Sequence, residues 1–312
     1  MRQLGDAPRT LELRSVSAAE IGDVSAFYER YASEPLIVRD LFGPHHPLAS
    51  LDLGSIERML GNARIHVYGS STPGYQEVPA SEILAGMRDK RMRGRSSVPH
   101  NVVDFYIAGT PLGDLVEVPP FLTQNWFLGA PANRDELEKS LVLSPAGSFT
   151  SLHLDAYAMQ GWMYLIAGSK TWRFYPPAAA LAAFDPVFKQ FYDPRLHSLH
   201  QYPLLAQMDY YEGTLNGGEL LYFPAGWIHH VVTTELSFGA GGSVINDYQI
   251  EDHMRWWLWE RTLHLEGTLD LMRVIEQMPL DRMSGPSGHA RAQAAIALCE
   301  KWEIRMSELA RQ

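Results

Sequence analysis

Residues 101–250 carry the feature that most constrains the fold, a series of short segments rich in β-branched and aromatic residues. Glycine, proline and asparagine separate the segments, and Asn216-Gly217-Gly218 is a tight-turn signal before one of them. Regularly spaced short strands with such turns are typical of an antiparallel sandwich or barrel. The sequence therefore predicts a mainly β core over residues 101–250. The expected strand segments are NVVDFYIAG, SLVLSPAG, GWMYLIAGSKTWRFYPP, NGGELLYFPAGWIHHVV and GGSVINDYQI.

The two flanks of this core have a different pattern. Residues 1–100 mix a helical segment, SAAEIGDVSAFYERYA, with the extended segments EPLIVRDLF and ARIHVYG, which favours an N-terminal α/β layer packing on the core. Residues 251–312 show helical spacing in HMRWWLWERTLHL and LDLMRVIEQM, so we expect a C-terminal helical appendage. Its last stretch repeats apolar residues at steps of three and four: Ala295, Cys299, Trp302, Met306 and Leu309.

The composition argues against several classes of partner. A chain of 312 residues with 46% hydrophobic content can bury a large core, and we expect one elaborated domain. The net charge of -10 opposes binding to nucleic acid or anionic lipid, which needs a basic face. The start, MRQLGDAPRTLELRSVS, has no apolar signal region, and no run of about 18 apolar residues could span a bilayer. We therefore expect a soluble, cytoplasmic protein with no membrane partner.

One pair of residues points to metal chemistry. The chain has a single cysteine, Cys299, so any metal must be held by histidine and carboxylate. His153 and Asp155 are separated by one residue, and alternate residues of a strand project from the same face. A third ligand can come from GWIHHVV, where His229 and His230 face opposite sides if the segment is extended. Two histidines and one carboxylate are typical of non-haem Fe(II) oxygenases, but zinc sites also use them, so the spacing leaves the metal open.

Three segments resemble a known family. They are TSLHLDAYAMQGWMYLIAGSKTWRFYPP, GGELLYFPAGWIHHV and SVINDY, and they resemble the JmjC group of Fe(II)- and 2-oxoglutarate-dependent oxygenases, especially its small hydroxylases. The resemblance covers residues 34–250, with the motifs in family order. It implies a double-stranded β-helix (jelly-roll, cupin-like) core and an iron site made by His153, Asp155 and His229. It also implies that 2-oxoglutarate is oxidised by O2 to succinate and CO2 while a substrate is hydroxylated.

The resemblance assigns four further residues to the co-substrate, 2-oxoglutarate. Thr150 matches the threonine three residues before the first ligand, and Lys170 matches the lysine of the Gly-x-Lys segment. Tyr106 and Asn246 are similar to further contacts. A buried carboxylate needs a partner, for which Lys170 supplies charge while Thr150 and Tyr106 supply hydroxyl donors.

The sequence leaves the reaction and the substrate open. Demethylation is the main alternative within the family; we favour hydroxylation because the chain has no cysteine cluster and no room for reader modules. Two interpretations do not involve 2-oxoglutarate: a metal-dependent cupin enzyme that does not use it, and a non-catalytic, ligand-binding jelly roll. The substrate is a peptide, an amino acid or a small metabolite.

Three regions outside the core have more than one interpretation. The cluster of Trp256, Trp257 and Trp259 predicts a homodimer through the C-terminal helices, because one small domain can scarcely bury it. The basic stretch 88–95 is a solvated loop or a flap that attracts an anionic substrate, and residues 178–215 are a surface insertion or part of the substrate mouth. We favour the solvated loop and the surface insertion.

Overall fold

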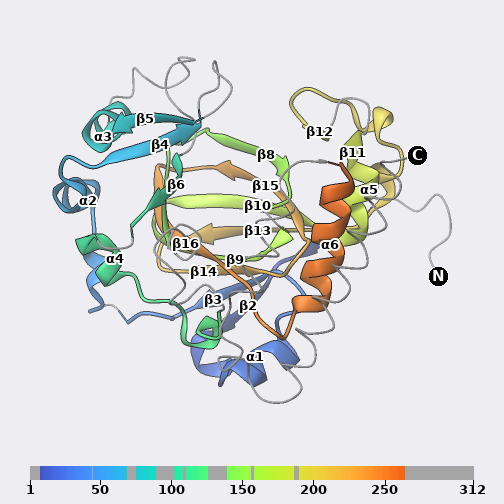
Figure 1. Cartoon of the computed structure of the whole chain (residues 1–312), viewed down its shortest axis with the longest axis horizontal. Coiled ribbons are helices and arrows are strands. Elements are labelled where there is room, and N and C mark those ends of the chain that lie inside the picture. The colour runs from blue at the N-terminus through green and yellow to red at the C-terminus, as the bar shows by residue number, and fades with distance from the viewer. Residues whose placement is uncertain are drawn as a thin grey trace, which may run out of the picture.

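Two β-sheets form the centre of the molecule (Figure 1). The structure is a computed structural model that describes residues 8–43, 45–68, 75–88, 102–107, 110–125, 139–155, 158–185 and 190–263. One sheet has seven strands in the order β2-β3-β14-β9-β16-β7-β6, and the other has five in the order β1-β13-β10-β15-β8. The seven strands are β2 (Arg14–Ser17), β3 (Leu36–Arg39), β14 (Leu220–Phe223), β9 (Gln160–Ala167), β16 (Ser237–Val244), β7 (Ser140–Ser144) and β6 (Val102–Tyr106). The five strands are β1 (Thr10–Glu12), β13 (Tyr210–Asn216), β10 (Ser169–Tyr175), β15 (Ile228–Thr233) and β8 (Phe149–His153).

Eight of these strands wind between the sheets as a double-stranded β-helix. Along the chain, β7, β9, β14 and β16 lie in the seven-stranded sheet, whereas β8, β10, β13 and β15 lie in the five-stranded sheet. Every pairing among them is antiparallel. The predicted mainly β, jelly-roll fold is therefore confirmed.

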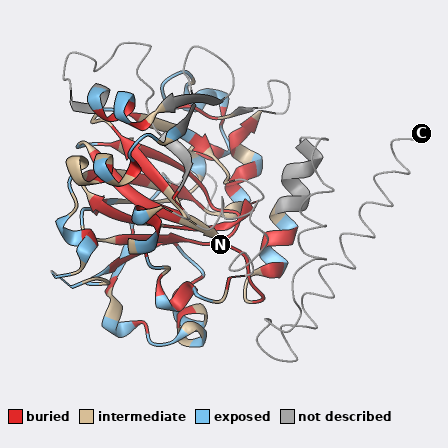
Figure 2. Cartoon of the chain, turned by 60° about the vertical axis from the view of Figure 1, so that its left-hand side comes forward, coloured by how far each residue is buried: buried red, intermediate tan, exposed pale blue. Residues whose placement is uncertain are grey.

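Among the described residues, apolar clusters lie between the sheets and on each outer face. Residues of both sheets meet between them, where Trp172 and Phe174 of β10 pack with Phe223 of β14. The outer face of the seven-stranded sheet packs against N-terminal segments, as when Phe27 contacts Tyr222. Most strand residues are buried, and the exposed residues gather on the surrounding helices and loops (Figure 2).

Strands from the first hundred residues extend both core sheets. β1 runs parallel to β13, and β3 pairs antiparallel with β14 and parallel with β2. The helix α1 (Val24–Arg30) begins after Asp23, whose carboxylate accepts a hydrogen bond from the Ala26 backbone at 2.9 Å. The N-terminal α/β layer is thus joined to the core by hydrogen-bonded strands. A division of the chain at residues 100 and 250 stays a prediction.

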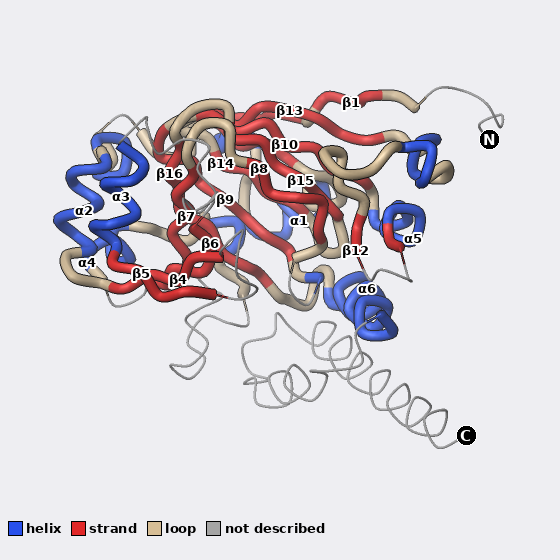
Figure 3. Tube along the Cα trace, turned by 90° about the horizontal axis from the view of Figure 1, so that it is seen from above, coloured by secondary structure: helices blue, strands red, loops and turns tan. Residues whose placement is uncertain are grey.

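Apart from α1, the α-helices lie at the two ends of the sheets (Figure 3). At one end are α2 (Leu53–Leu60), α3 (Ala80–Arg88) and α4 (Pro111–Leu115), beside the hairpin of β4 (Arg64–Tyr68) and β5 (Tyr75–Pro79). At the other end are α5 (Ala180–Ala183) and α6 (Ile250–Leu263). Between these two ends, the inner faces of the two sheets are turned toward each other, and the region between them is called the inner space below.

The segment between β10 and β13 covers the outer face of the five-stranded sheet. It contains three 3-10 turns, α5 and a short pair of strands, β11 (Phe184–Asp185) and β12 (Gln190–Phe191). Its Tyr192, Tyr202 and Leu205 are buried against Tyr175 of β10 and Ile228 of β15. The described part of the 178–215 region therefore packs on the face of the sheet that points away from the inner space. Residues 186–189 lie outside the described residues.

Helix α6 packs against the turn that precedes β15. Gly226 in this turn has φ +80°, and a Cβ at this position would lie 2.3 Å from Cδ1 of Trp256. Glycine is therefore required by both the backbone conformation and the close approach of the helix. The predicted dimer helices beyond residue 263 and the basic stretch from residue 89 lie outside the described residues, so both stay predictions.

Candidate metal centre

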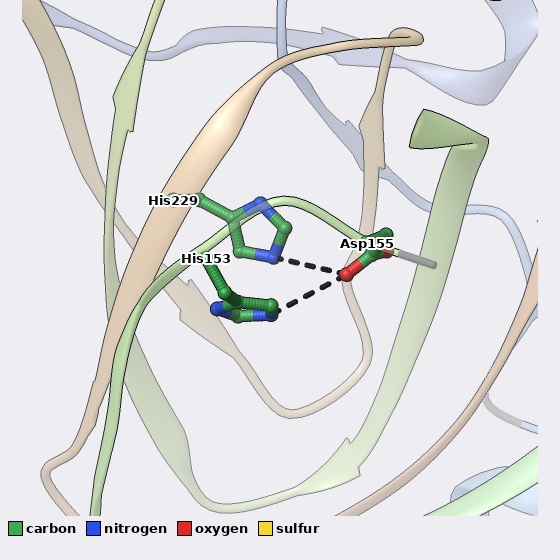
Figure 4. A group of neighbouring side chains, drawn as sticks. All are labelled: His153, Asp155 and His229. Atoms are coloured by element: carbon green, nitrogen blue, oxygen red, sulfur yellow. Dashed lines mark ion pairs between the residues drawn. The ribbon is translucent and has the colours of Figure 1, made fainter. Parts of the chain in front are cut away.

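Three side chains that can bind a metal converge in the inner space between the sheets (Figure 4). His153 ends β8, and it lies directly opposite His229 of β15 in the strand register. Asp155 follows β8 and points its carboxylate at both rings (Figure 4). Its Oδ1 lies 3.3 Å from Nε2 of His153 and 3.7 Å from Nε2 of His229. The possible ligand atoms of the three residues lie within 4.8 Å of one another, which is close enough to share one ion.

Backbone carbonyls fix the orientation of both histidine rings. Nδ1 of His153 lies 2.8 Å from the Ser151 carbonyl, and Nδ1 of His229 lies 3.1 Å from the Trp227 carbonyl. A carbonyl only accepts hydrogen bonds, so each Nδ1 carries the proton and donates. Each Nε2 is therefore the ring atom that points at Asp155, and in the neutral ring it offers the lone pair that a metal ligand requires. Two imidazole nitrogens and one carboxylate oxygen fit Fe(II), and they leave coordination positions for other ligands.

The charges of the three residues also suit a cation. Burial, together with repulsion from His153, lowers the pKa of His229 to about 4 and keeps this ring neutral. Burial opposes the charge on Asp155, but the hydrogen bond with His153 and the nearby histidines bring the pKa of that carboxyl below its ordinary value. A neutral imidazole beside an ionised carboxylate is the protonation state in which both residues bind metal.

Aromatic rings enclose one side of the centre and leave the other side open. The ring of His229 lies 4.7 Å from Phe223, 5.2 Å from Phe174 and 5.5 Å from Trp172, measured between ring centroids. These contacts leave the side chain of His229 only 3% exposed, whereas His153 is 35% exposed and Asp155 is 28% exposed. A substrate can therefore approach from the side of His153 and Asp155.

Lys170 lies on the same inner face as His229. Along β10, Lys170, Trp172 and Phe174 alternate with outward residues, and they lie opposite Thr233, Val231 and His229 of β15. Lys170 is 3% exposed, and its Nζ donates a hydrogen bond to Oγ of Ser144 at 2.8 Å. Burial lowers its pKa to about 7. Among the described residues no carboxylate pairs with this lysine.

Thr150 lies on the inner face as well. It is opposite Val231 in the pairing of β8 with β15, and directly opposite residues of an antiparallel pair share one face. Val231 in turn lies opposite Trp172, the neighbour of Lys170 on this face. The register therefore brings Thr150 and Lys170 to the same inner region.

Asn246, a predicted co-substrate residue, is fully buried and bonded to protein groups. Its Nδ2 donates to the Tyr28 hydroxyl at 2.6 Å and to the Gln124 carbonyl at 3.0 Å. Its Oδ1 accepts from Gln160 and from the Tyr248 backbone. The amide is thus fully engaged within the protein, so its contact with a co-substrate stays a prediction.

Tyr106, the fourth predicted co-substrate residue, ends β6 and pairs with Ser140 of β7 through the backbone. Its side chain lies outside the described residues, so its predicted role stays a prediction as well.

His230 lies on the outer face of the sheet. It is opposite Arg173 on β10, and its ring is 5.5 Å from that of Phe149. Burial and the neighbouring Arg173 lower its pKa to about 4. The structure thus separates the two adjacent histidines, with His229 beside Asp155 and His153, and His230 behind the sheet. The alternation of side chains along GWIHHVV is the sequence signal for this separation.

Sequence reasoning did not identify Ser144 or the aromatic residues around His229. Trp172 and Phe174 carry a usable signal, because they follow Lys170 at steps of two on one strand. Ser144 has no such sequence signal, because its contact with Lys170 joins two sheets and depends on how they face each other. Phe223 is likewise brought to His229 only by the pairing of the strands into a barrel.

The fold and this site define the chain as a jelly roll with a metal-binding group of two histidines and one aspartate. A family model described as a cupin-like domain matches residues 124–257. The human 2-oxoglutarate and iron-dependent oxygenase JMJD4 is 26% identical over 195 residues, which is 61% of this chain and 44% of that protein. The family model and these relatives support the JmjC, cupin-like family that the resemblance implied.

Other relatives carry demethylase names. The arginine-specific demethylase JMJ20 of Arabidopsis thaliana is 19% identical over 222 residues, which is 64% of this chain and 47% of that protein. The JmjC domain-containing histone demethylation protein 1 of Mycosarcoma maydis is 25% identical over 170 residues, covering 48% of this chain and 24% of that protein. The chain thus spans between a quarter and a half of the length of these relatives.

The helices of the described residues include none that is long and apolar enough to cross a membrane. The cytoplasmic location stays a prediction.

Proposed function

We propose that the chain is an Fe(II)- and 2-oxoglutarate-dependent oxygenase that hydroxylates a peptide, an amino acid or a small metabolite. One observation carries the proposal: an open group of three metal ligands and a buried lysine with no carboxylate partner among the described residues lie on the inner side of the same sheet. A metal ion would bind to the three ligands, and the distal carboxylate of a diacid would pair with the lysine. A metal site alone would not account for Lys170.

In this proposal His153, Asp155 and His229 hold the metal. The carbonyls of Ser151 and Trp227 accept from the two Nδ1 atoms and so keep both Nε2 atoms directed at the ion. Bound iron, with O2 and 2-oxoglutarate, supplies the oxidising chemistry that releases succinate and CO2 and adds a hydroxyl group to the substrate. The exposed side of His153 and Asp155 is where the chain admits that substrate.

Lys170 and Thr150 orient the co-substrate in this proposal. Lys170 lies four residues along β10 from Phe174, the residue opposite His229, so the cation is held away from the metal ligands. A dicarboxylate can therefore reach the metal with one end and Lys170 with the other. The charge-assisted hydrogen bond fixes the distal end, and Trp172, between the two on the same face, excludes water from the middle.

The relatives favour a second candidate within the same chemistry. JMJ20 and the Mycosarcoma maydis protein are named demethylases, whereas JMJD4 is named an oxygenase. Hydroxylation of an N-methyl group leads to demethylation, so the same residues serve both reactions. Mass spectrometry of the product separates them, because hydroxylation adds one oxygen to the substrate while demethylation releases formaldehyde.

Anaerobic addition of Fe(II) followed by 2-oxoglutarate tests the proposal. We expect a visible charge-transfer band from the chelate in the wild-type protein, and no band in the matched His153→Ala variant. Iron binding without the band would favour a metal-dependent cupin that does not use 2-oxoglutarate. Failure to bind iron would instead favour a non-catalytic jelly roll.

A further inference from the structure

The side chain of Lys170 crosses the inner space from one sheet to the other. Lys170 belongs to β10 in the five-stranded sheet, whereas its partner Ser144 is the last residue of β7 in the seven-stranded sheet. Nζ of Lys170 and Oγ of Ser144 lie 2.8 Å apart, and Ser144 has no exposed surface. A long side chain that begins on one sheet is thus anchored on the facing sheet.

This anchor leaves donors of Lys170 free for a ligand. A lysine ammonium has three N–H donors and no acceptor. One of the three donates to Ser144, and this is the one side-chain hydrogen bond that Lys170 makes within the described part of the chain. The remaining two donors are sufficient to bind a carboxylate, provided that the ammonium is held in one place.

Holding the ammonium in place is a substantial task because lysine is flexible. Its side chain loses rotamer entropy when it is fixed in one conformation. A site whose lysine is already fixed before the ligand arrives avoids that loss at the moment of binding. A buried hydroxyl on the facing sheet is suited to this, since it accepts a hydrogen bond without neutralising the charge.

Ser140, on the same strand and four residues before Ser144, shows what a serine in β7 does without this contact. Its hydroxyl donates to the Gly241 carbonyl of the neighbouring strand β16 at 3.4 Å. Ser140 is therefore tied to the backbone of its own sheet, and Ser144 is tied to a charged side chain of the facing sheet. The difference makes Ser140 a matched control.

We propose that Ser144 is a positioning residue that fixes the ammonium of Lys170, so that its two other N–H donors meet the distal carboxylate of the co-substrate. This inference rests on the proposed function, and it deepens that function by adding a residue of the facing sheet to the co-substrate site. Ser144 acts through Lys170 and does not itself touch the co-substrate.

Equilibrium binding of 2-oxo acids to the iron-loaded, oxygen-free protein tests the role of Ser144. The variants are Ser144→Ala and the control Ser140→Ala, and the signal is the charge-transfer band of the chelate. The ligands are 2-oxoglutarate and 2-oxobutanoate, which has the same 2-oxo acid group but no distal carboxylate. We expect Ser144→Ala to weaken 2-oxoglutarate binding about tenfold, the loss of roughly one hydrogen bond, and to leave 2-oxobutanoate binding unchanged.

The control and a second variant make the outcome decisive. Ser140→Ala should bind both ligands as the wild type does. If Ser144→Ala fails to fold, Ser144→Cys replaces it, because a thiol has a similar shape but is a weak hydrogen-bond acceptor, and the same selective loss is expected.

Equal weakening of both ligands would show a merely structural role and overturn the inference, as would unchanged or tighter binding of 2-oxoglutarate. Absence of any 2-oxoglutarate complex in the wild type would overturn the proposed function itself.

Discussion

Charged side chains are paired differently on the two faces of the five-stranded sheet. On the inner face, Lys170 has no carboxylate partner among the described residues, and Asp155 faces the Nε2 atoms of two histidines. On the outer face, Arg173 is paired with Glu212, and Arg195 is paired with Asp193. The outer charges are thus neutralised within the protein, whereas the proposed function assigns ligands to the inner ones. The site is therefore marked by the position of unpaired polar groups on one face of a sheet, and not by how many polar residues the chain contains.

The outer pairs are complete in geometry as well as in charge. Nε and Nη2 of Arg173 donate to Oε2 of Glu212 at 2.9 and 2.6 Å, and its guanidinium lies 4.3 Å from the Tyr210 ring. Arg195 makes the same kind of contact with Asp193 and lies 4.1 Å from the Phe149 ring. These arginines therefore stabilise the packing of the insertion and have no role left for a ligand.

The largest effect that the comparison predicts separates the adjacent histidines. His229→Ala removes a ligand from the inner face and should abolish iron-dependent decarboxylation of 2-oxoglutarate. The loss should exceed the roughly 10- to 100-fold effect of losing a contact that only supports a ligand. His230→Ala, on the outer face, should retain a measurable fraction of the activity. Succinate formation, measured at equal concentrations of folded protein, checks both variants.

The relative activities of the His229→Ala and His230→Ala variants test which side chains of β15 face inward. Circular dichroism shows whether each variant is folded, so that a loss of activity is not a loss of structure. Because His230 is buried, its replacement is expected to lower thermal stability moderately. Activity retained in His229→Ala and lost in His230→Ala would mean that the inner face of β15 is misassigned.

The next largest effect is expected for Lys170, and it distinguishes this lysine from Arg173 on the outer face of the same strand. Lys170→Met keeps the length and apolar stem of the side chain but removes its charge. We expect it to weaken 2-oxoglutarate binding roughly 10- to 100-fold, because charge-assisted hydrogen bonds are lost. Iron binding should be nearly intact. The matched variant Arg173→Met removes a cation from the outer face of the same strand, and calorimetry should find its affinity for 2-oxoglutarate unchanged.

A pH titration distinguishes the inner cation further. Burial lowers the pKa of Lys170 to about 7, and only the charged form pairs with a carboxylate. Affinity for 2-oxoglutarate should therefore fall as the pH rises above 7, approaching about tenfold per pH unit. The folded-state pKa lies below the ordinary lysine value, so the stability of the protein without co-substrate should instead rise with pH over this range.

Lys170→Met is the control for this titration. The variant has no lysine to deprotonate at this position, so its weaker binding should lose the dependence on pH above 7. An equal pH dependence in both proteins would assign it to another group and contradict the role of Lys170.

The jelly roll and the convergence of His153, Asp155 and His229 could be predicted because their signals are local. Alternation along a strand places His153 with Asp155, and it separates His229 from His230, without knowledge of the rest of the fold. The resemblance to a known family then ordered the strands. For the same reason Lys170 was identified by its position after Gly168 and by its charge within a strand-rich region.

What could not be predicted depends on how distant strands pack. The anchor of Lys170 on Ser144 requires the two sheets to face each other in one register, which no local spacing encodes. The hydrogen bonds of Asn246 to Tyr28 and Gln124 connect the core with segments far away in the chain. The pairing of β1 and β3 with core strands was also unpredicted, because an N-terminal layer and a sheet extension have the same strand signals.

The smallest effect on 2-oxoglutarate binding is expected for Arg195, and it tests whether the outer face is only structural. Arg195→Ala breaks a pair with Asp193 that is about half exposed on the arginine side, at 49%. Asp193 is only 9% exposed, so the variant leaves a nearly buried carboxylate without its guanidinium donors, and the free energy of unfolding should fall by roughly 1–3 kcal/mol. The stacking on Phe149 adds little at an exposed site. Chemical denaturation measures this change, and 2-oxoglutarate binding should be the same as in the wild type. A large loss of co-substrate affinity with little loss of stability would mean that Arg195 on the outer face influences the inner site. The assignment of packing to the outer face and ligand binding to the inner face would then be wrong.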